Sequence, residues 1–239
     1  MRTINTAIDL VKEIINNNND GVEQLLEIVD LQETDWLELK AATLPESYTY
    51  KKDKNGNKKE NKHDYYWHVA RAVIALANTR GGAVIIGIDD HCNYVGLEAS
   101  VEPTKKYLEN GYEEFIRKVI EPAISPENGW KCLDNGEIAL TSGSYVANIE
   151  FTTEKYRKGD VVIVYINPII DSDKLLRINQ NKNNMEREFV PYRVKGNIGK
   201  VKELFKNEDI IRYINERKQR GFQDSKFSKL YDEFIEKFG

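Results

Sequence analysis

The stretch Glu33–Lys40, "ETDWLELK", carries both the pattern of a β-strand and a dense set of reactive side chains. Leu37 and Leu39 alternate with Glu38 and Lys40, and a period of two is typical of a strand. On such a strand the two leucines point into the core, while Glu38 and Lys40 share the opposite face. The stretch therefore predicts a strand over residues 36–40 that presents an acid and a base together.

An acid and a lysine on one face suit the hydrolysis of a phosphodiester. The carboxylate can hold a divalent metal, which lowers the pKa of a bound water. The lysine can orient that water or offset the charge that builds on the phosphate. A cross-strand ion pair on a solvated face explains the same two residues, and spacing alone favours this simpler interpretation.

Glu33 lies five residues before Glu38, which is an odd separation. On one regular strand the two side chains would face opposite sides. They converge only if the chain bends or bulges near Thr34 and Asp35. Otherwise Glu33 is an ordinary acid that precedes a strand.

Asp89 and Asp90 follow the apolar stretch "AVIIGI", residues 83–88, which is typical of a buried strand. Functional groups are common where a strand ends. Two adjacent aspartates cannot both point to one face, so at most one is expected in a site. The alternative is turn chemistry, because Asp and Asn favour turns.

The chain has 239 residues, a net charge of −4 and two cysteines. Few cysteines, the lack of an apolar signal-peptide region at the N-terminus and the lack of a membrane-spanning apolar run predict a cytoplasmic protein with no membrane partner. An acidic protein can bind nucleic acid only through a local basic patch. Residues 51–62, "KKDKNGNKKENK", supply one candidate, with six lysines against two acids.

The order of the expected elements predicts an α+β fold with a mixed sheet and helical segments at both termini. We expect boundaries at residues 1–27, 28–200 and 201–239. Residues 64–79 are expected to form a helix capped by Asp64 and ended by the glycines of "RGG". Residues from 201 onward are expected to be helical and split at Gly221.

Four stretches together resemble the Schlafen AlbA-type domain family over about residues 28–200: "ETDWLELK", "ALANTRGG", "AVIIGIDD" and "PYRVKGN". The resemblance implies a mixed β-sheet core with helices packed on it. Some members of this family are metal-dependent endoribonucleases that cut transfer RNA or ribosomal RNA. Others are known only as DNA-binding modules.

The resemblance also implies a site. The nucleases of the family use two glutamates five residues apart and a later aspartate, which match Glu33, Glu38 and Asp89. These three residues are therefore expected to hold Mg²⁺ or Mn²⁺ and to be catalytic. Lys40 matches the family's lysine after the second acid and is the fourth expected catalytic residue. The resemblance implies a bent approach to the strand, which would resolve the odd spacing.

The leading hypothesis is an endoribonuclease that cleaves structured RNA such as transfer RNA, in a stress or anti-phage response. The residues expected to contact backbone phosphates are Lys51, Lys52, Lys54, Lys58, Lys59, Lys62, Arg193 and Lys195. One alternative is a non-catalytic module that binds DNA or RNA within a regulator. Another is a protein-interaction subunit that uses its terminal helices. Homodimerisation through those helices and activation by a partner protein are further hypotheses.

Overall fold

The computed structural model describes most, but not all, of the chain. The described residues are 4–16, 20–41, 50–52, 54–56, 58–60, 62–96, 129–132, 138–141, 149–156, 159–169, 174–182, 185–194, 200–220 and 224–239. Lys195, one of the residues predicted to contact phosphate, lies outside them.

A four-stranded mixed sheet forms the centre of the fold, with strand order β1-β4-β8-β7. Strand β1 (Leu37–Lys40) runs parallel to β4 (Gly82–Ile86). Strand β8 (Gly159–Ile166) is antiparallel to both β4 and β7 (Ile149–Tyr156). Together with the helices packed around it, this sheet confirms the predicted α+β class and the predicted strand at residues 36–40.

Helix α4 (Lys62–Asn78) connects the parallel strands β1 and β4. A parallel pair needs such a crossover, because a tight turn cannot bring the chain back to the same end of the sheet. The helix begins at Lys62, so the prediction that Asp64 caps it is wrong, and Asp64 lies within the first turn instead.

Two glycines end α4 and bring β4 against β1. Gly81 has a φ of +72°, and its N–H donates to the carbonyl of Leu76 at 2.9 Å. A Cβ atom on Gly82 would lie 1.9 Å from the carbonyl oxygen of Trp36. The prediction that "RGG" ends the helix is therefore confirmed, and the structure shows in addition that Gly82 is a close-packed strand position.

The remaining strands form smaller antiparallel sheets. A hairpin of β2 (Tyr50–Lys52) and β3 (Lys58–Glu60) precedes α4. The other two sheets have the orders β10-β11-β12 and β6-β5-β9. Their strands are β5 (Gly129–Cys132), β6 (Ile138–Thr141), β9 (Lys174–Leu176), β10 (Ile178–Lys182), β11 (Met185–Arg193) and β12 (Val201–Leu204).

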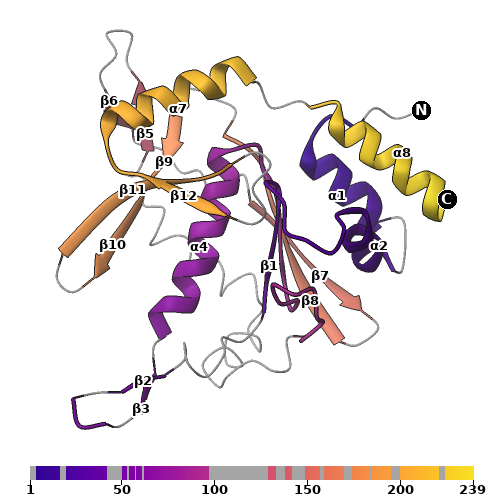
Figure 1. Cartoon of the computed structure of the whole chain (residues 1–239), viewed down its shortest axis with the longest axis horizontal. Helices are drawn as coiled ribbons and strands as arrows, with labels where there is room; N and C mark the ends of the chain where they lie inside the picture. The colour runs from indigo at the N-terminus through magenta and orange to yellow at the C-terminus, as the bar shows by residue number, and fades with distance from the viewer. Residues whose placement is uncertain are drawn as a thin grey trace.

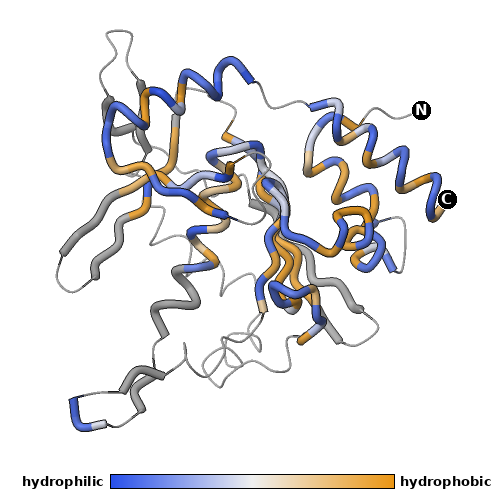
Figure 2. Tube along the Cα trace, in the orientation of Figure 1, coloured by the Kyte–Doolittle hydropathy of each residue, from blue (hydrophilic) through white to orange (hydrophobic). Residues whose placement is uncertain are grey.

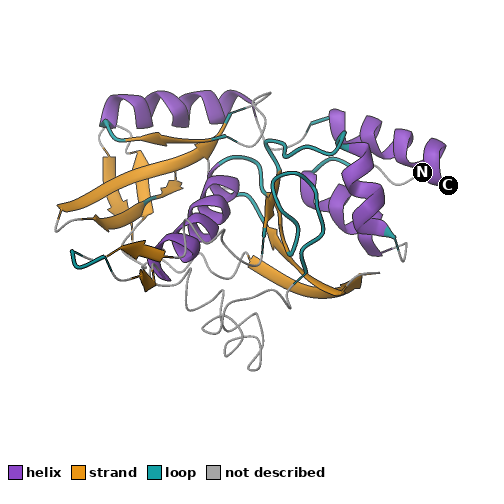
Figure 3. Ribbon diagram, turned by 60° about the horizontal axis from the view of Figure 1, so that its bottom comes forward, coloured by secondary structure: helices purple, strands orange, loops and turns teal. Residues whose placement is uncertain are grey.

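Helix α4 lies between the central sheet and the β10-β11-β12 sheet, as Figures 1 and 3 show. The prediction of a helix from residue 201 is wrong for β12, because this short segment pairs with β11 from Val190–Leu204 to Arg193–Val201. Helix α7 (Asn207–Arg220) follows, and α8 (Lys226–Phe238) begins after the predicted break near Gly221.

Helices α1 (Ala7–Asn16), α2 (Gly21–Ile28) and α8 form a layer on the face of the central sheet opposite α4 (Figure 1). Leu37 and Leu39 are fully buried in the cluster that this layer makes with the sheet, which confirms their predicted direction. Figure 2 shows the hydrophobic residues concentrated along the central strands. None of the helices in the described part of the chain is long and apolar enough to cross a bilayer.

Asn78, the last residue of α4, fastens the helix to two strands. Its side chain is fully buried. The amide nitrogen donates to the carbonyls of Leu176 (2.8 Å) and Pro191 (2.9 Å), and the amide oxygen accepts from the N–H of Leu176 (2.7 Å). These bonds dock β9 and β11 against α4 and thereby set where Arg193, the last residue of β11, lies.

We predict that Asn78→Ala lowers the free energy of unfolding by about 3 kcal/mol, because it leaves buried backbone groups without partners. Urea denaturation of wild type and variant measures this difference. Asn215→Ala, at an exposed position of α7, is the matched control and should change stability by less than about 0.5 kcal/mol. Equal effects at the two positions would show that the Asn78 bonds are not structural.

Candidate active site

A bend at Thr34 places Glu33 and Glu38 on either side of a tight turn. The Thr34 hydroxyl oxygen accepts the N–H groups of Trp36 (3.2 Å) and Leu37 (2.9 Å), while the Thr34 N–H donates to the Leu37 carbonyl (3.0 Å). Side-chain bonds of this kind favour turns over continued strand. The bend required for the two glutamates to converge is therefore present.

Glu33 folds back along β1 after this bend. Its Oε1 accepts the N–H of Leu39 at 2.9 Å. Strand β1 is at the edge of the sheet, and an edge strand has backbone N–H groups that no neighbouring strand satisfies. The glutamate supplies that acceptor and is held beside the strand that carries Glu38.

The ammonium group of Lys40 lies among three carboxylates. Its Nζ is 2.5 Å from Glu38 Oε1, 3.6 Å from Glu33 Oε1 and 3.6 Å from Asp90 Oδ1. It also donates to the Leu39 carbonyl at 2.8 Å. The Glu33 and Glu38 side chains are only 13% and 6% exposed, whereas Asp90 is 72% exposed. The two glutamates and Lys40 therefore form a mostly buried cluster that meets solvent near Asp90.

Arg193 pairs with the second carboxylate oxygen of Glu38 from the buried side. Its side chain has no exposed surface. Burial lowers the pKa of the guanidinium to about 10, although the charges of Glu33 and Asp35 raise it. It is therefore still protonated at neutral pH. This burial offers no exposed group for the predicted phosphate contact; Arg193 instead holds Glu38 in place.

The carboxylate of Asp89 is used within its own turn. Oδ1 accepts the backbone N–H groups of His91 (2.9 Å) and Asn93 (2.8 Å), and Oδ2 accepts the Asn93 amide at 3.1 Å. Burial alone would raise the pKa of Asp89, but these hydrogen bonds outweigh it and hold the pKa below its usual value. These contacts agree with the alternative that Asp89 serves the turn. Its neighbour Asp90, and not Asp89, is the aspartate that lies near Lys40.

The predicted three-carboxylate metal site is not assembled in this arrangement. Among the described residues, no group of three or more His, Cys, Asp or Glu side chains could hold a metal ion. Glu33 and Glu38, however, already place oxygens around a single cation, the Lys40 ammonium. Mg²⁺ prefers oxygen ligands and is often held by one or two carboxylates together with substrate phosphates. The donor set fits that kind of site.

The lysine-rich segment forms a separate feature. In the β2–β3 hairpin, Lys51 is paired with Lys59 and Lys52 with Lys58. Lys54 is exposed in the connecting turn, and Lys62 is the first residue of α4. The hairpin lies beyond the N-terminal end of α4, away from the layer of α1, α2 and α8 (Figure 1).

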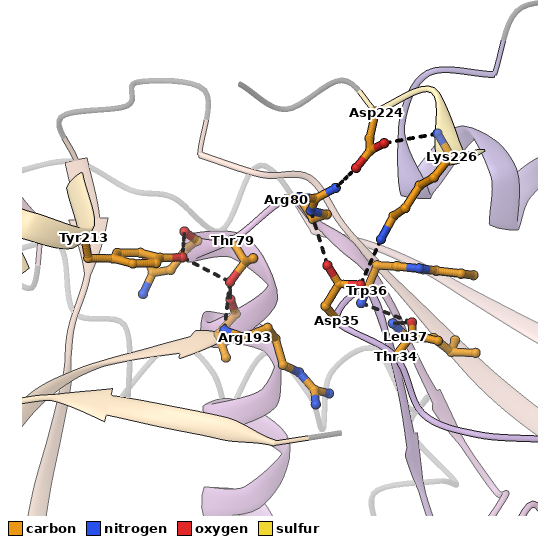
Figure 4. A network of polar contacts seen from close by, with 12 residues as sticks. Thr34, Asp35, Trp36, Leu37, Thr79, Arg80, Arg193, Tyr213, Asp224 and Lys226 are labelled. Atoms are coloured by element: carbon orange, nitrogen blue, oxygen red, sulfur yellow. Dashed lines mark hydrogen bonds and ion pairs between the residues drawn. The ribbon is translucent and has the colours of Figure 1, made fainter. Parts of the chain in front are cut away.

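Sequence reasoning missed the structural role of Arg193. Figure 4 shows how it is anchored: its backbone N–H donates to the Thr79 hydroxyl at 2.9 Å, which in turn lies 3.3 Å from the hydroxyl of Tyr213. The one signal in the sequence was an arginine inside the otherwise uncharged stretch "FVPYRV" of residues 189–194. A charge in such a stretch needs a buried partner.

Residues 33–202 match the protein family described as Schlafen, AlbA_2. Among solved structures, the chain is similar to the DIP2311 protein from Corynebacterium diphtheriae, with 15% sequence identity and a TM-score of 0.39. That similarity covers 77% of this chain and 30% of the other, so the chain spans under a third of that protein's length. A search of the curated proteins found no significant match. The family match covers well over half of the sequence and includes the Glu33–Glu38–Lys40 cluster; the chain belongs to the Schlafen AlbA_2 family.

Proposed function

We propose that the chain is a metal-dependent endoribonuclease whose reaction centre is the cluster of Glu33, Glu38 and Lys40. Family membership supports a nucleic-acid-related function. The observation that carries the finer proposal is the convergence of two glutamates, from opposite sides of a bend, on one lysine. An ion pair on a solvated face would not explain why Glu38 is buried and backed by Arg193.

Each residue of the cluster has a distinct proposed role. Glu33 and Glu38 would hold Mg²⁺ or Mn²⁺, which lowers the pKa of a bound water and offsets phosphate charge. Arg193 would fix the orientation of Glu38 and balance its charge, because a buried carboxylate is stable only when it is paired. Lys40, at the more open side, would turn from the carboxylates to the scissile phosphate and offset its developing charge.

The β2–β3 hairpin supports an anionic partner. In the backbone register of this hairpin, Lys51 is opposite Lys59 and Lys52 is opposite Lys58, in strands of three residues. A short hairpin is marginally stable by itself. Because lysines gathered in one segment attract the phosphates of a nucleic-acid backbone, we propose that the hairpin lysines bind a structured RNA such as transfer RNA. The proposed setting is a stress or anti-phage response.

We expect Glu38→Gln to lower the rate of transfer RNA cleavage about 1,000-fold while RNA binding persists, because the variant removes a charge needed at the reaction centre. Incubation with total transfer RNA and Mn²⁺ or Mg²⁺, with EDTA as a blank, measures this loss. Glu33→Gln should lower the cleavage rate to a similar extent, and it leaves the pair of Arg193 with Glu38 in place. Glu208→Gln, at an exposed position of α7, is the control and should cleave normally. Wild-type protein that binds RNA but yields no fragments would favour a non-catalytic module.

Asp89 and Asp90 should respond differently to the same substitution. Asp89→Asn should keep most of the activity, because an asparagine oxygen can still accept the turn's N–H groups. Asp90→Asn should lower kcat/KM several-fold, since it removes the exposed charge beside Lys40. Kinetics on one RNA substrate compare the two variants. Loss of all cleavage in Asp89→Asn alone would instead make Asp89 a metal ligand, as the family resemblance implies.

Replacing Lys51, Lys52, Lys58 and Lys59 with glutamine should weaken RNA binding and flatten its salt dependence. The slope of log K against log salt should fall by about one for each lysine that contacts a phosphate. Filter binding at several salt concentrations measures the slope, and Lys229→Gln, at an exposed position of α8, is the control. An unchanged slope would place the RNA contact elsewhere; no salt-sensitive binding at all would favour a protein-interaction subunit.

A further inference from the structure

Helix α8 contacts the bend that carries the two glutamates, although it lies beyond the residues matched to the family. Phe227 is fully buried, and its ring meets that of Trp36 edge to face, with centroids 5.8 Å apart. Lys226 Nζ donates to Asp35 Oδ1 at 2.9 Å. Two consecutive residues of the bend are thus held by two consecutive residues of α8, and Figure 4 shows the pair of Lys226 with Asp35.

Asp35 depends on this contact because its carboxylate is buried, with only 7% of its side chain exposed. Oδ1 accepts the bond from Lys226. Oδ2 faces Arg80 Nε at 3.4 Å and has no hydrogen-bond partner among the described residues. Arg80 in turn donates to Asp224 Oδ2 at 2.8 Å. The four charges alternate in sign, and the loss of Lys226 would leave a buried carboxylate poorly satisfied.

The start of α8 is itself fixed in the fold. Asp224 Oδ1 accepts the N–H of Lys226 at 3.1 Å, and the Asp224 N–H donates to the carbonyl of Asn5 at 3.1 Å. The Ser228 hydroxyl donates to the Ile4 carbonyl at 2.6 Å. The segment before α1 therefore braces α8, and α8 braces the bend.

We propose that Lys226 and Phe227 are positioning residues, which hold Asp35 and Trp36 so that Glu33 and Glu38 face the same cation. The two glutamates lie on either side of the bend, so a looser bend changes their separation. The catalytic consequence rests on the proposed nuclease function, whereas the structural consequence does not. The AlbA_2 segment would then depend on the C-terminal helix for a competent site.

The test compares Lys226→Met with Lys237→Met in the full chain. Lys237 is on the same helix and pairs with Glu27 at 2.9 Å, but its side chain is 50% exposed and it is not a partner of Asp35. The first readout is hydrogen exchange of the Leu39 amide by NMR, because this N–H donates to Glu33. Lys226→Met should speed that exchange roughly tenfold more than it speeds exchange in the central strand β8, and Lys237→Met should not.

The second readout is RNA cleavage. Lys226→Met should lower kcat roughly 10- to 100-fold with little change in KM, because the reacting groups are misplaced while the hairpin lysines remain. Lys226→Arg should restore most of the rate. In an Asp35→Asn background, Lys226→Met should have no further effect, since Lys226 acts through Asp35. Phe227→Leu, which keeps an apolar side chain but loses the ring contact, should resemble a milder Lys226→Met.

The outcomes separate the two proposals. Faster exchange of the Leu39 amide in Lys226→Met, with no RNA cleavage by the wild type, would support the positioning role and contradict the proposed nuclease function. If the wild type cleaves RNA but Lys226→Met and Lys237→Met have the same Leu39 exchange rate and the same kcat, the positioning role is overturned. The proposed nuclease function would then still stand. Additive effects of Asp35→Asn and Lys226→Met would likewise overturn the proposed route through Asp35.

Discussion

The parallel pairing of β1 with β4 is the constraint on which the rest of the structure depends. Leu37 is paired with Ala83 and Lys40 with Ile86, so the C-terminal ends of both strands lie side by side. The pairing requires α4 as a crossover, and it requires glycine at position 82, where the backbone of Trp36 leaves no room for a side chain. It also brings the chain that follows β4, with Asp90, back beside Lys40.

Buried charges are balanced separately on the two sides of the Thr34 bend. Glu38 is paired with Arg193 of β11, whose backbone N–H donates to Thr79, the residue that follows α4. Asp35 is paired with Arg80 and with Lys226 of α8. Burying each pair costs desolvation free energy, so the pair adds little net stability. Removing one partner, however, would leave an unpaired charge in the core. The pairs therefore serve to specify the geometry of the bend, and that geometry is what lets two glutamates meet one lysine.

The residues matched to the AlbA_2 family include the bend and the central sheet, and the contacts of each acid come from the structure. The aspartate that the resemblance matched to the metal site caps its own turn, and the following aspartate occupies the open side of the cluster. The lysine-rich hairpin lies within the residues matched to the family, whereas α8 lies beyond them. The proposed nuclease would combine the cluster of Glu33, Glu38 and Lys40 with a phosphate-binding hairpin and a C-terminal helix that braces the bend.

The sequence by itself determined the features that depend on neighbours along the chain. Alternation of Leu37 and Leu39 indicated β1, and the glycines after Arg80 indicated the end of α4, because periodicity and backbone preference are local properties. The short β12, by contrast, is a strand only because β11 lies beside it. The partners of the buried acids are also distant in the sequence: Lys226 is 191 residues from Asp35. Only the tertiary structure could decide the strand β12 and these ion-pair partners. Many charged side chains could satisfy a buried carboxylate, and the packing of distant elements selects which one does.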